Sequence, residues 1–134
     1  MESKLIAETF VDLVMNHFNE VKIKPPTHNR PNRISLYVPN KNRNKRWMQI
    51  DWNTDSLSIA MDHLQRDITE QEVKSSGIPY GDFNGKDSRI RLNNDSAVFL
   101  TIFPSNIGNL ITEDLISFLE VHYNSYLRRV GRND

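Results

Sequence analysis

The chain has 134 residues, of which 17 are lysine or arginine, 17 are aspartate or glutamate and none is cysteine. This length suits a single domain with a buried core, and the lack of cysteine excludes disulfides, thiolate metal sites and cysteine nucleophiles. The first residues do not have the pattern of a signal peptide, and no apolar run reaches the roughly 18 residues of a membrane span. We therefore expect residues 1–134 to form one cytoplasmic domain with no membrane contact.

The charges are divided unevenly along the chain. Residues 21–50 contain eight lysines and arginines and no carboxylate, whereas the rest of the chain contains nine basic and seventeen acidic side chains. Such a concentration of positive charge is most commonly used to neutralise phosphate groups. The alternatives are an acidic protein partner, or a solvated surface balanced by the acidic part of the same chain.

The first half of the chain predicts one helix and three strands. Apolar residues repeat with helical spacing over 3–20, and the prolines and asparagines of 25–33 indicate a loop. Alternating apolar residues then predict strands over 34–38, 47–52 and 57–61, joined by polar turns at 39–45 and 53–55. These connections are too short for parallel crossovers, so the three strands should form an antiparallel meander.

The second half predicts a loop region, a hairpin and a long helix. Within 62–87, Thr69 and Glu72 have the spacing of a capping box for one or two helical turns, and glycines make most of the remainder irregular. Alternation around Ile90 and over 97–103 predicts a hairpin. Thr112 should cap a final helix that runs to Val130, with acidic residues in its first turn and arginines in its last.

These elements predict an α+β fold, a two-layer sandwich. An antiparallel sheet of about five strands, a three-strand meander plus a hairpin, should carry the N- and C-terminal helices packed on one face.

The other face of the sheet should carry the residues that alternate with the aliphatic ones. Four aromatic side chains beside two arginines have the composition of a stacking platform, on which flat groups lie on rings while guanidinium groups hold phosphate. The same aromatic residues could instead be covered by the 62–87 segment, or by a second copy of the chain in a homodimer.

Two patterns suggest metal chemistry, and both have simpler explanations. Asp51, Asp55 and Asp62 occupy ligand positions of a calcium loop, but Ser56 stands where its sharp turn needs glycine, and a β-turn explains the same residues. Glu72-Val73-Lys74 has the form of a nuclease motif that would need Asp51, Asp62 or Asp67 as a metal-binding partner. Neither pattern leads us to expect a bound metal.

Of the four histidines, His63 is the one candidate for a general base, because it lies near Asp62 and Asp67 at the end of a strand. His17 and His122 lie on helices and are expected to be structural. No nucleotide-binding or hydrolase motif is present.

The sequence therefore favours a small non-enzymatic binding domain without a cofactor, contacting a polyanion, most simply nucleic acid, through the basic 22–46 segment and the adjoining sheet face. The alternative is a protein-interaction module such as an inhibitor, an immunity-type protein or a regulatory protein, working as a homodimer through the sheet face; a metal-dependent nuclease is a third hypothesis. The residues expected to contact the polyanion are Arg30, Arg33, Lys41, Arg43, Lys45, Arg46, Arg89 and Arg91, and those expected to stack or to form an interface are Tyr37, Trp47, Phe99 and Phe103.

Overall fold

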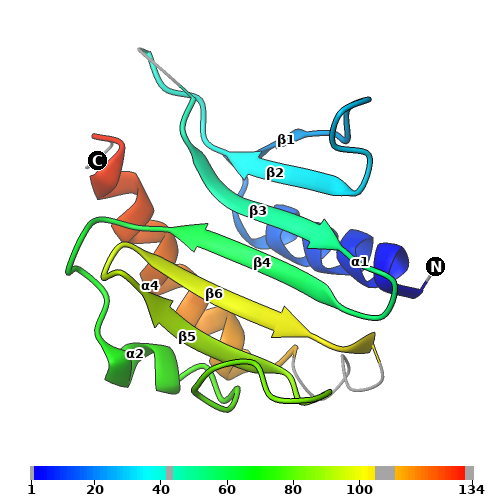
Figure 1. The fold of residues 1–134 in the computed structure, drawn as a ribbon. Helices are drawn as coiled ribbons and strands as arrows, with labels where there is room; N and C mark the ends of the chain where they lie inside the picture. Colours follow the sequence, from blue (N-terminus) through cyan, green and yellow to red (C-terminus); the bar gives the residue numbers. More distant parts are fainter. Residues whose placement is uncertain (1, 42–43, 105–110, 132–134) are drawn as a thin grey trace.

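The protein folds as an antiparallel sheet with its two long helices on one face, so the predicted α+β fold is confirmed (Figure 1). The structure, a computed structural model, describes residues 2–41, 44–104 and 111–131. In chain order the elements are α1 (Glu2–His17), β1 (Lys22–Lys24), β2 (Arg33–Tyr37), β3 (Arg46–Trp52), β4 (Leu57–Asp62), α2 (Glu70–Lys74), β5 (Arg89–Asn93), β6 (Ala97–Ile102) and α4 (Glu113–Arg129).

The sheet has six strands in the order β1-β2-β3-β4-β6-β5, and every neighbouring pair is antiparallel. The predicted meander is β2-β3-β4 and the predicted hairpin is β5-β6. The sixth strand, β1, pairs with β2 and has only three residues, two lysines around Ile23. A strand this short has no periodic pattern, which is why the sequence did not predict it.

The core lies between the sheet and the helices α1 and α4. Leu36, Ile50, Ile59 and Leu100 point toward the helices and are buried, as their alternation predicts. Burial of each such side chain contributes roughly 1.5–3 kcal/mol before the loss of chain entropy is counted. In Figure 1 both helices lie behind the sheet, so the face turned to the viewer is the one they leave open.

Both predicted helix caps are present. The Thr69 side chain accepts a hydrogen bond from Glu72 N, and the Glu72 carboxylate accepts one from Thr69 N at 2.8 Å, which completes the capping box. Thr112 accepts from Leu115 N at 3.3 Å. These bonds satisfy backbone N–H groups that the first turn of a helix leaves without partners.

Trp47 lies on the helix side of the sheet, so its predicted position on the outer face is wrong. The pairing between β2 and β3 shifts at this point, because Leu36 lies opposite Met48 whereas Tyr37 lies opposite Arg46. Trp47 is therefore the extra residue of a β-bulge, and it is buried together with Met48. A bulge inserts one extra residue into a strand, so side chains on either side of it no longer alternate regularly between the two faces. Counting alternate positions through the bulge therefore assigns Trp47 to the wrong face.

The hydroxyl of Tyr126, on α4, fixes both ends of the basic turn between β2 and β3. It accepts a hydrogen bond from Val38 N at 3.0 Å and donates one to the carbonyl of Lys45. Asn40 adds a third connection, because its side-chain amide donates to the carbonyl of Val130 at 2.5 Å. The turn is thus attached at its base to the C-terminal end of α4.

The substitution Tyr126→Phe should destabilise the protein, since it leaves the buried Val38 N–H without a partner. Such a loss costs about 1–3 kcal/mol, measurable as a lower free energy of unfolding in urea followed by tryptophan fluorescence. Tyr37→Phe is the matched control, because Tyr37 is half-exposed on the neighbouring strand. It should change the free energy of unfolding by less than about 0.5 kcal/mol, and equal effects of the two substitutions would contradict the assignment.

Candidate functional site

The face of the sheet that the helices leave open, here called the outer face, carries regular rows of side chains. Residues directly opposite each other in an antiparallel pair lie on the same face. One row crosses all six strands. Its first member, on β1, is exposed, and its other five members are half-exposed. This row is Lys24, Ser35, Gln49, Ala60, Phe99 and Arg91.

Two arginines predicted to bind phosphate are already paired on this face. Arg33 contacts Asp51 with two nitrogens, Nε to Oδ1 at 2.7 Å and Nη2 to Oδ2 at 3.3 Å. Arg46 Nε lies 2.6 Å from an oxygen of Asp62. Both carboxylates follow residues 21–50 in the chain and reach these arginines only because β3 and β4 pair beside β2. The positive charges of Arg33 and Arg46 are therefore largely balanced by these two carboxylates.

The two arginines of β5 also have acidic neighbours. Arg91 Nε lies 3.1 Å from Asp82, whose side chain is 91% exposed. Arg89 Nη2 lies 3.6 Å from Asp87, and its buried Nε has no hydrogen-bond partner among the described residues. Because exposed ion pairs contribute only about 0–1 kcal/mol, these contacts can be exchanged at little cost.

The aromatic residues of the predicted platform are fewer and less available than expected. Tyr37 and Phe99 do lie half-exposed on the outer face, but a cation covers a face of each ring: Lys24 Nζ is 5.3 Å from the Tyr37 centroid and the Arg91 guanidinium 5.0 Å from that of Phe99. Phe103 is 5% exposed, so its predicted exposure on the outer face is wrong. The strand ends before it, and Phe83 packs over it with ring centroids 5.6 Å apart.

The 62–87 segment thus covers one end of the outer face, as one of the two alternatives anticipated. Its cover is partial, since Gln49, Ala60 and Phe99 in the middle of the face remain half-exposed.

Three more predicted cations, Arg30, Lys41 and Lys45, are exposed, whereas Arg43 lies outside the described residues. Arg30 is at the tip of the β1-β2 hairpin, far along β2 from the turn that carries the two lysines. Additional exposed cations lie on elements that connect to that turn. They are Lys22 and Lys24 on β1, which pairs with β2, and Arg129 at the end of α4, next to the Val130 carbonyl that Asn40 contacts. We call the set Lys22, Lys24, Lys41, Lys45 and Arg129 the cationic corner.

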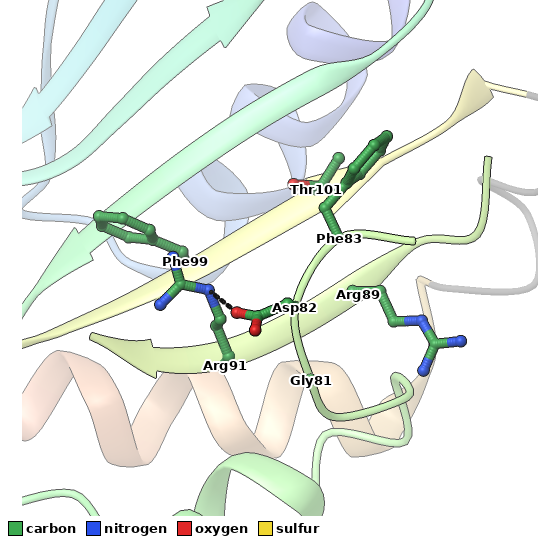
Figure 2. A pocket seen from close by; sticks show the side chains of 7 residues that line it. All are labelled: Gly81, Asp82, Phe83, Arg89, Arg91, Phe99 and Thr101. Carbon is green, nitrogen blue, oxygen red and sulfur yellow. Dashed lines mark ion pairs between the residues drawn. The ribbon is translucent and has the colours of Figure 1, made fainter. Parts of the chain in front are cut away.

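A shallow pocket of about 270 Å³ lies at the other side of the outer face (Figure 2). Phe99 and Thr101 of β6 and Arg91 of β5 form its sheet side, and the 81–83 segment crosses in front of them. Figure 2 shows Asp82 reaching toward Arg91, while the guanidinium of Arg89 points away on the other side of the segment. Phe83, 58% exposed, lies at the rim.

The histidine proposed as a general base belongs to a buried hydrogen-bond chain. The indole N–H of Trp47 donates to His122 Nδ1 at 2.9 Å, so His122 carries its proton on Nε2 and donates to His63 Nδ1 at 3.1 Å. His63 in turn donates from Nε2 to the carbonyl of Asp95 at 3.2 Å. Indole nitrogen can only donate, and this one constraint sets both tautomers. Both rings are buried and each of their nitrogens has a hydrogen-bond partner, which fits a structural role better than catalysis.

Burial keeps both histidines neutral. It lowers the pKa of His122 to about 3, with the neighbouring His63 ring as a second cause. Burial also lowers the pKa of His63, although a hydrogen bond to the Asp95 backbone and the nearby carboxylates of Asp67 and Asp62 oppose the shift. A proton on His122 Nδ1 would break the bond from Trp47, so the hydrogen-bond chain exists only in the neutral state.

Four of the acidic residues considered for metal chemistry have other partners. Asp51 and Asp62 pair with Arg33 and Arg46, Glu72 is used in the capping box, and Asp67 pairs with Arg128. In the part of the chain that the structure describes, no three histidine or acidic side chains gather as metal ligands. The same described part has no helix long and apolar enough to cross a bilayer.

Comparisons with protein-family models, with curated proteins and with solved structures find no match to this chain.

The neutral histidine pair should make the protein less stable as the pH falls. The unfolded chain binds a proton at His122 near pH 6.5, whereas the folded chain does so only near pH 3; stability is therefore complete above the unfolded pKa and declines below it. Between pH 7.5 and 5.5, His122 alone should lower the free energy of unfolding by roughly 1–1.5 kcal/mol. Urea denaturation at a series of pH values measures this.

His122→Gln should flatten this pH dependence while also lowering stability, because it removes the titrating ring and disturbs the hydrogen-bond chain. His17→Gln changes an exposed histidine on α1 and should leave the dependence unchanged. If His122→Gln retained the full wild-type slope, the buried pair would not be its source.

Proposed function

We propose that this protein is a non-enzymatic binding domain that takes a polyanion, nucleic acid, at the cationic corner. The observation that carries the proposal is the gathering of five exposed cations from three separate parts of the chain, none of which has an ion pair with a described carboxylate. By contrast, the arginines within the sheet are paired.

Strand pairing and the attachment of the turn bring these cations together. Lys22 lies opposite Tyr37, which lies opposite Arg46, the residue directly after Lys45. The bond from Asn40 to the carbonyl of Val130 holds the turn containing Lys41 against the end of α4, where Arg129 is the preceding residue. The lysines of β1 and of the turn thus border the same end of β2.

The mode of binding follows from which groups are free. Lysine ammonium groups on flexible stems contact phosphates as point charges and read no base sequence. The two outer-face rings are already covered by Lys24 and Arg91, so base stacking would have to displace these cations. We therefore expect binding to the phosphate backbone with little preference for base sequence.

Binding to a fluorescein-labelled oligonucleotide should be detectable by anisotropy at low salt and should weaken steeply as salt is added. With three or four phosphates contacted, the slope of log K against log salt should be about −3. The double substitution Lys22→Gln, Lys45→Gln should reduce the steepness by about two, because each lysine accounts for roughly one released counterion.

The matched control is Lys4→Gln, Lys86→Gln, which removes the same charge from exposed lysines outside the corner. It should leave the salt slope within about half a unit of the wild type. Absence of binding to single- and double-stranded DNA and RNA at low salt would reject the proposal, as would an equal loss in both double variants.

A second candidate, a homodimer formed through the outer face, is favoured by the half-exposed middle of that face. Gln49 and Ala60 are half-exposed on this face, and the arginines and aspartates beside them are already paired with each other. Charges that are already paired can be buried against another copy more readily than isolated ones.

Sedimentation equilibrium tests the homodimer directly. A protein that dimerises through this face should become monomeric on Ala60→Glu, which places an unpaired charge at the centre of the row. Val121→Glu adds the same charge at a 40% exposed position of α4, on the helix layer, and should leave the dimer intact. A wild-type protein that stays monomeric at high concentration excludes this candidate.

A further inference from the structure

The guanidinium group of Arg91, which lines this pocket, uses only part of its hydrogen-bonding capacity. Its Nη1 donates to the carbonyl of Leu92 at 3.4 Å and to the side chain of Asn93 at 3.3 Å. Neither Nε nor Nη2 donates a hydrogen bond to a described residue; Asp82 provides an ion pair at 3.1 Å from Nε without hydrogen-bond alignment. The Nε–Nη2 edge is the side on which a carboxylate can bind with both oxygens.

This guanidinium group is held in place. One face stacks on the Phe99 ring at 5.0 Å, and the two Nη1 contacts prevent rotation in its plane. An arginine with fixed orientation loses little conformational entropy when it binds a ligand, which favours a specific contact over a diffuse one.

The segment opposite Arg91 is fixed on both sides of its tip. Gly81 N donates to the carbonyl of Ile90 at 3.0 Å, and Ile90 N donates to the carbonyl of Pro79 at 3.0 Å. On the other side, Asp87 N donates to the carbonyl of Asn84 at 3.1 Å and closes a turn. Asp82 and Phe83 therefore remain beside the pocket even when the ion pair to Arg91 opens.

From this arrangement we propose that the pocket binds a monocarboxylate attached to an aromatic or apolar body, and that the Asp82 carboxylate occupies part of that site in the unbound protein. The ligand carboxylate takes the Nε–Nη2 edge of Arg91, displacing Asp82, and its apolar body lies between Phe99 and the exposed ring of Phe83. Displacement is cheap because the Asp82 side chain is 91% exposed and keeps its hydration in water.

Charge and size select this class of ligand. Arg89 and Arg91 both line the pocket, but Figure 2 shows the Arg89 guanidinium pointing away on the other side of the 81–83 segment. Asp82 stays nearby after displacement, so a doubly charged phosphate would be poorly balanced by Arg91. The volume of about 270 Å³ is slightly below the usual range for drug-sized ligands, roughly 300–1,000 Å³. It suits a fragment such as an aromatic amino acid with a blocked amine and a free carboxylate.

The test titrates the ¹⁵N-labelled chain of 134 residues with N-acetylphenylalanine and follows amide chemical shifts. We expect saturable shifts at Arg91, Phe99 and Phe83. The matched probe is N-acetylphenylalanine amide, which has the same ring without the charge and should bind at least about tenfold more weakly, as expected for loss of a charge-assisted hydrogen bond.

Two substitutions separate a specific site from a weak general attraction. Asp82→Asn should strengthen binding of the acid about two- to fivefold, since it removes the internal competitor, whereas Asp87→Asn, its control, should leave affinity unchanged. Arg91→Gln should weaken binding at least about tenfold. Should Arg91→Gln fold poorly, Phe83→Ala removes a 58% exposed ring, whose buried neighbour is Phe103, and should also weaken binding.

No saturable shifts at these residues, equal binding of the acid and the amide, or unchanged affinity in Asp82→Asn would each overturn the inference. A second arm uses a hexapeptide ending in phenylalanine with a free or an amidated C-terminus. Binding of the free-carboxyl peptide identifies a chain terminus as the source of the carboxylate, and binding of N-acetylphenylalanine alone identifies a small acid. No oligonucleotide is used, so the result is independent of the proposed nucleic-acid binding.

Discussion

The hydrogen bond from Trp47 to His122 is the interaction on which much of this structure depends. It ties the bulge of β3 to α4, and through His63 it continues to the carbonyl of Asp95 in the turn between β5 and β6. A buried polar group without a partner costs about 1–3 kcal/mol, and this chain gives each ring nitrogen a partner. Tyr126, also on α4, connects this helix to both ends of the basic turn through the hydrogen bonds of its hydroxyl group.

One consequence concerns how charge is distributed over the surface. Because the bulge turns Trp47 inward, Arg46 comes opposite Tyr37 on the outer face and meets Asp62 of β4. Arg33 similarly meets Asp51. The basic segment of the sequence is therefore not one uniformly positive surface. Arg33 and Arg46 are paired with carboxylates of the sheet. Lys22, Lys24, Lys41 and Lys45 belong with Arg129 to the cationic corner, and Arg30 is exposed at the other end of β2.

The outer face consequently has two regions of different chemistry. At the β1-β2 side, exposed lysines surround a tyrosine, which suits an extended array of negative charges. At the β5-β6 side, one oriented arginine stands between two phenylalanines and a nearby aspartate, which suits a single carboxylate with an apolar group. The first would bind through many weak, salt-sensitive contacts and the second through one directed contact.

The helices, five of the six strands and the two layers could be predicted from the sequence. Helical spacing, the Thr112 and Thr69 caps, and alternation in β2, β4 and β6 act between residues close in the chain, so the pattern contains them. It also gave the concentration of positive charge in residues 21–50. Which charges are free could not be predicted in this way, because Asp51 and Asp62 reach Arg33 and Arg46 through strand pairing. The inward position of Trp47 and the cover over Phe103 likewise depend on the tertiary structure. A bulge and a strand end interrupt alternation, and their positions depend on contacts with distant helices and loops that no local pattern records.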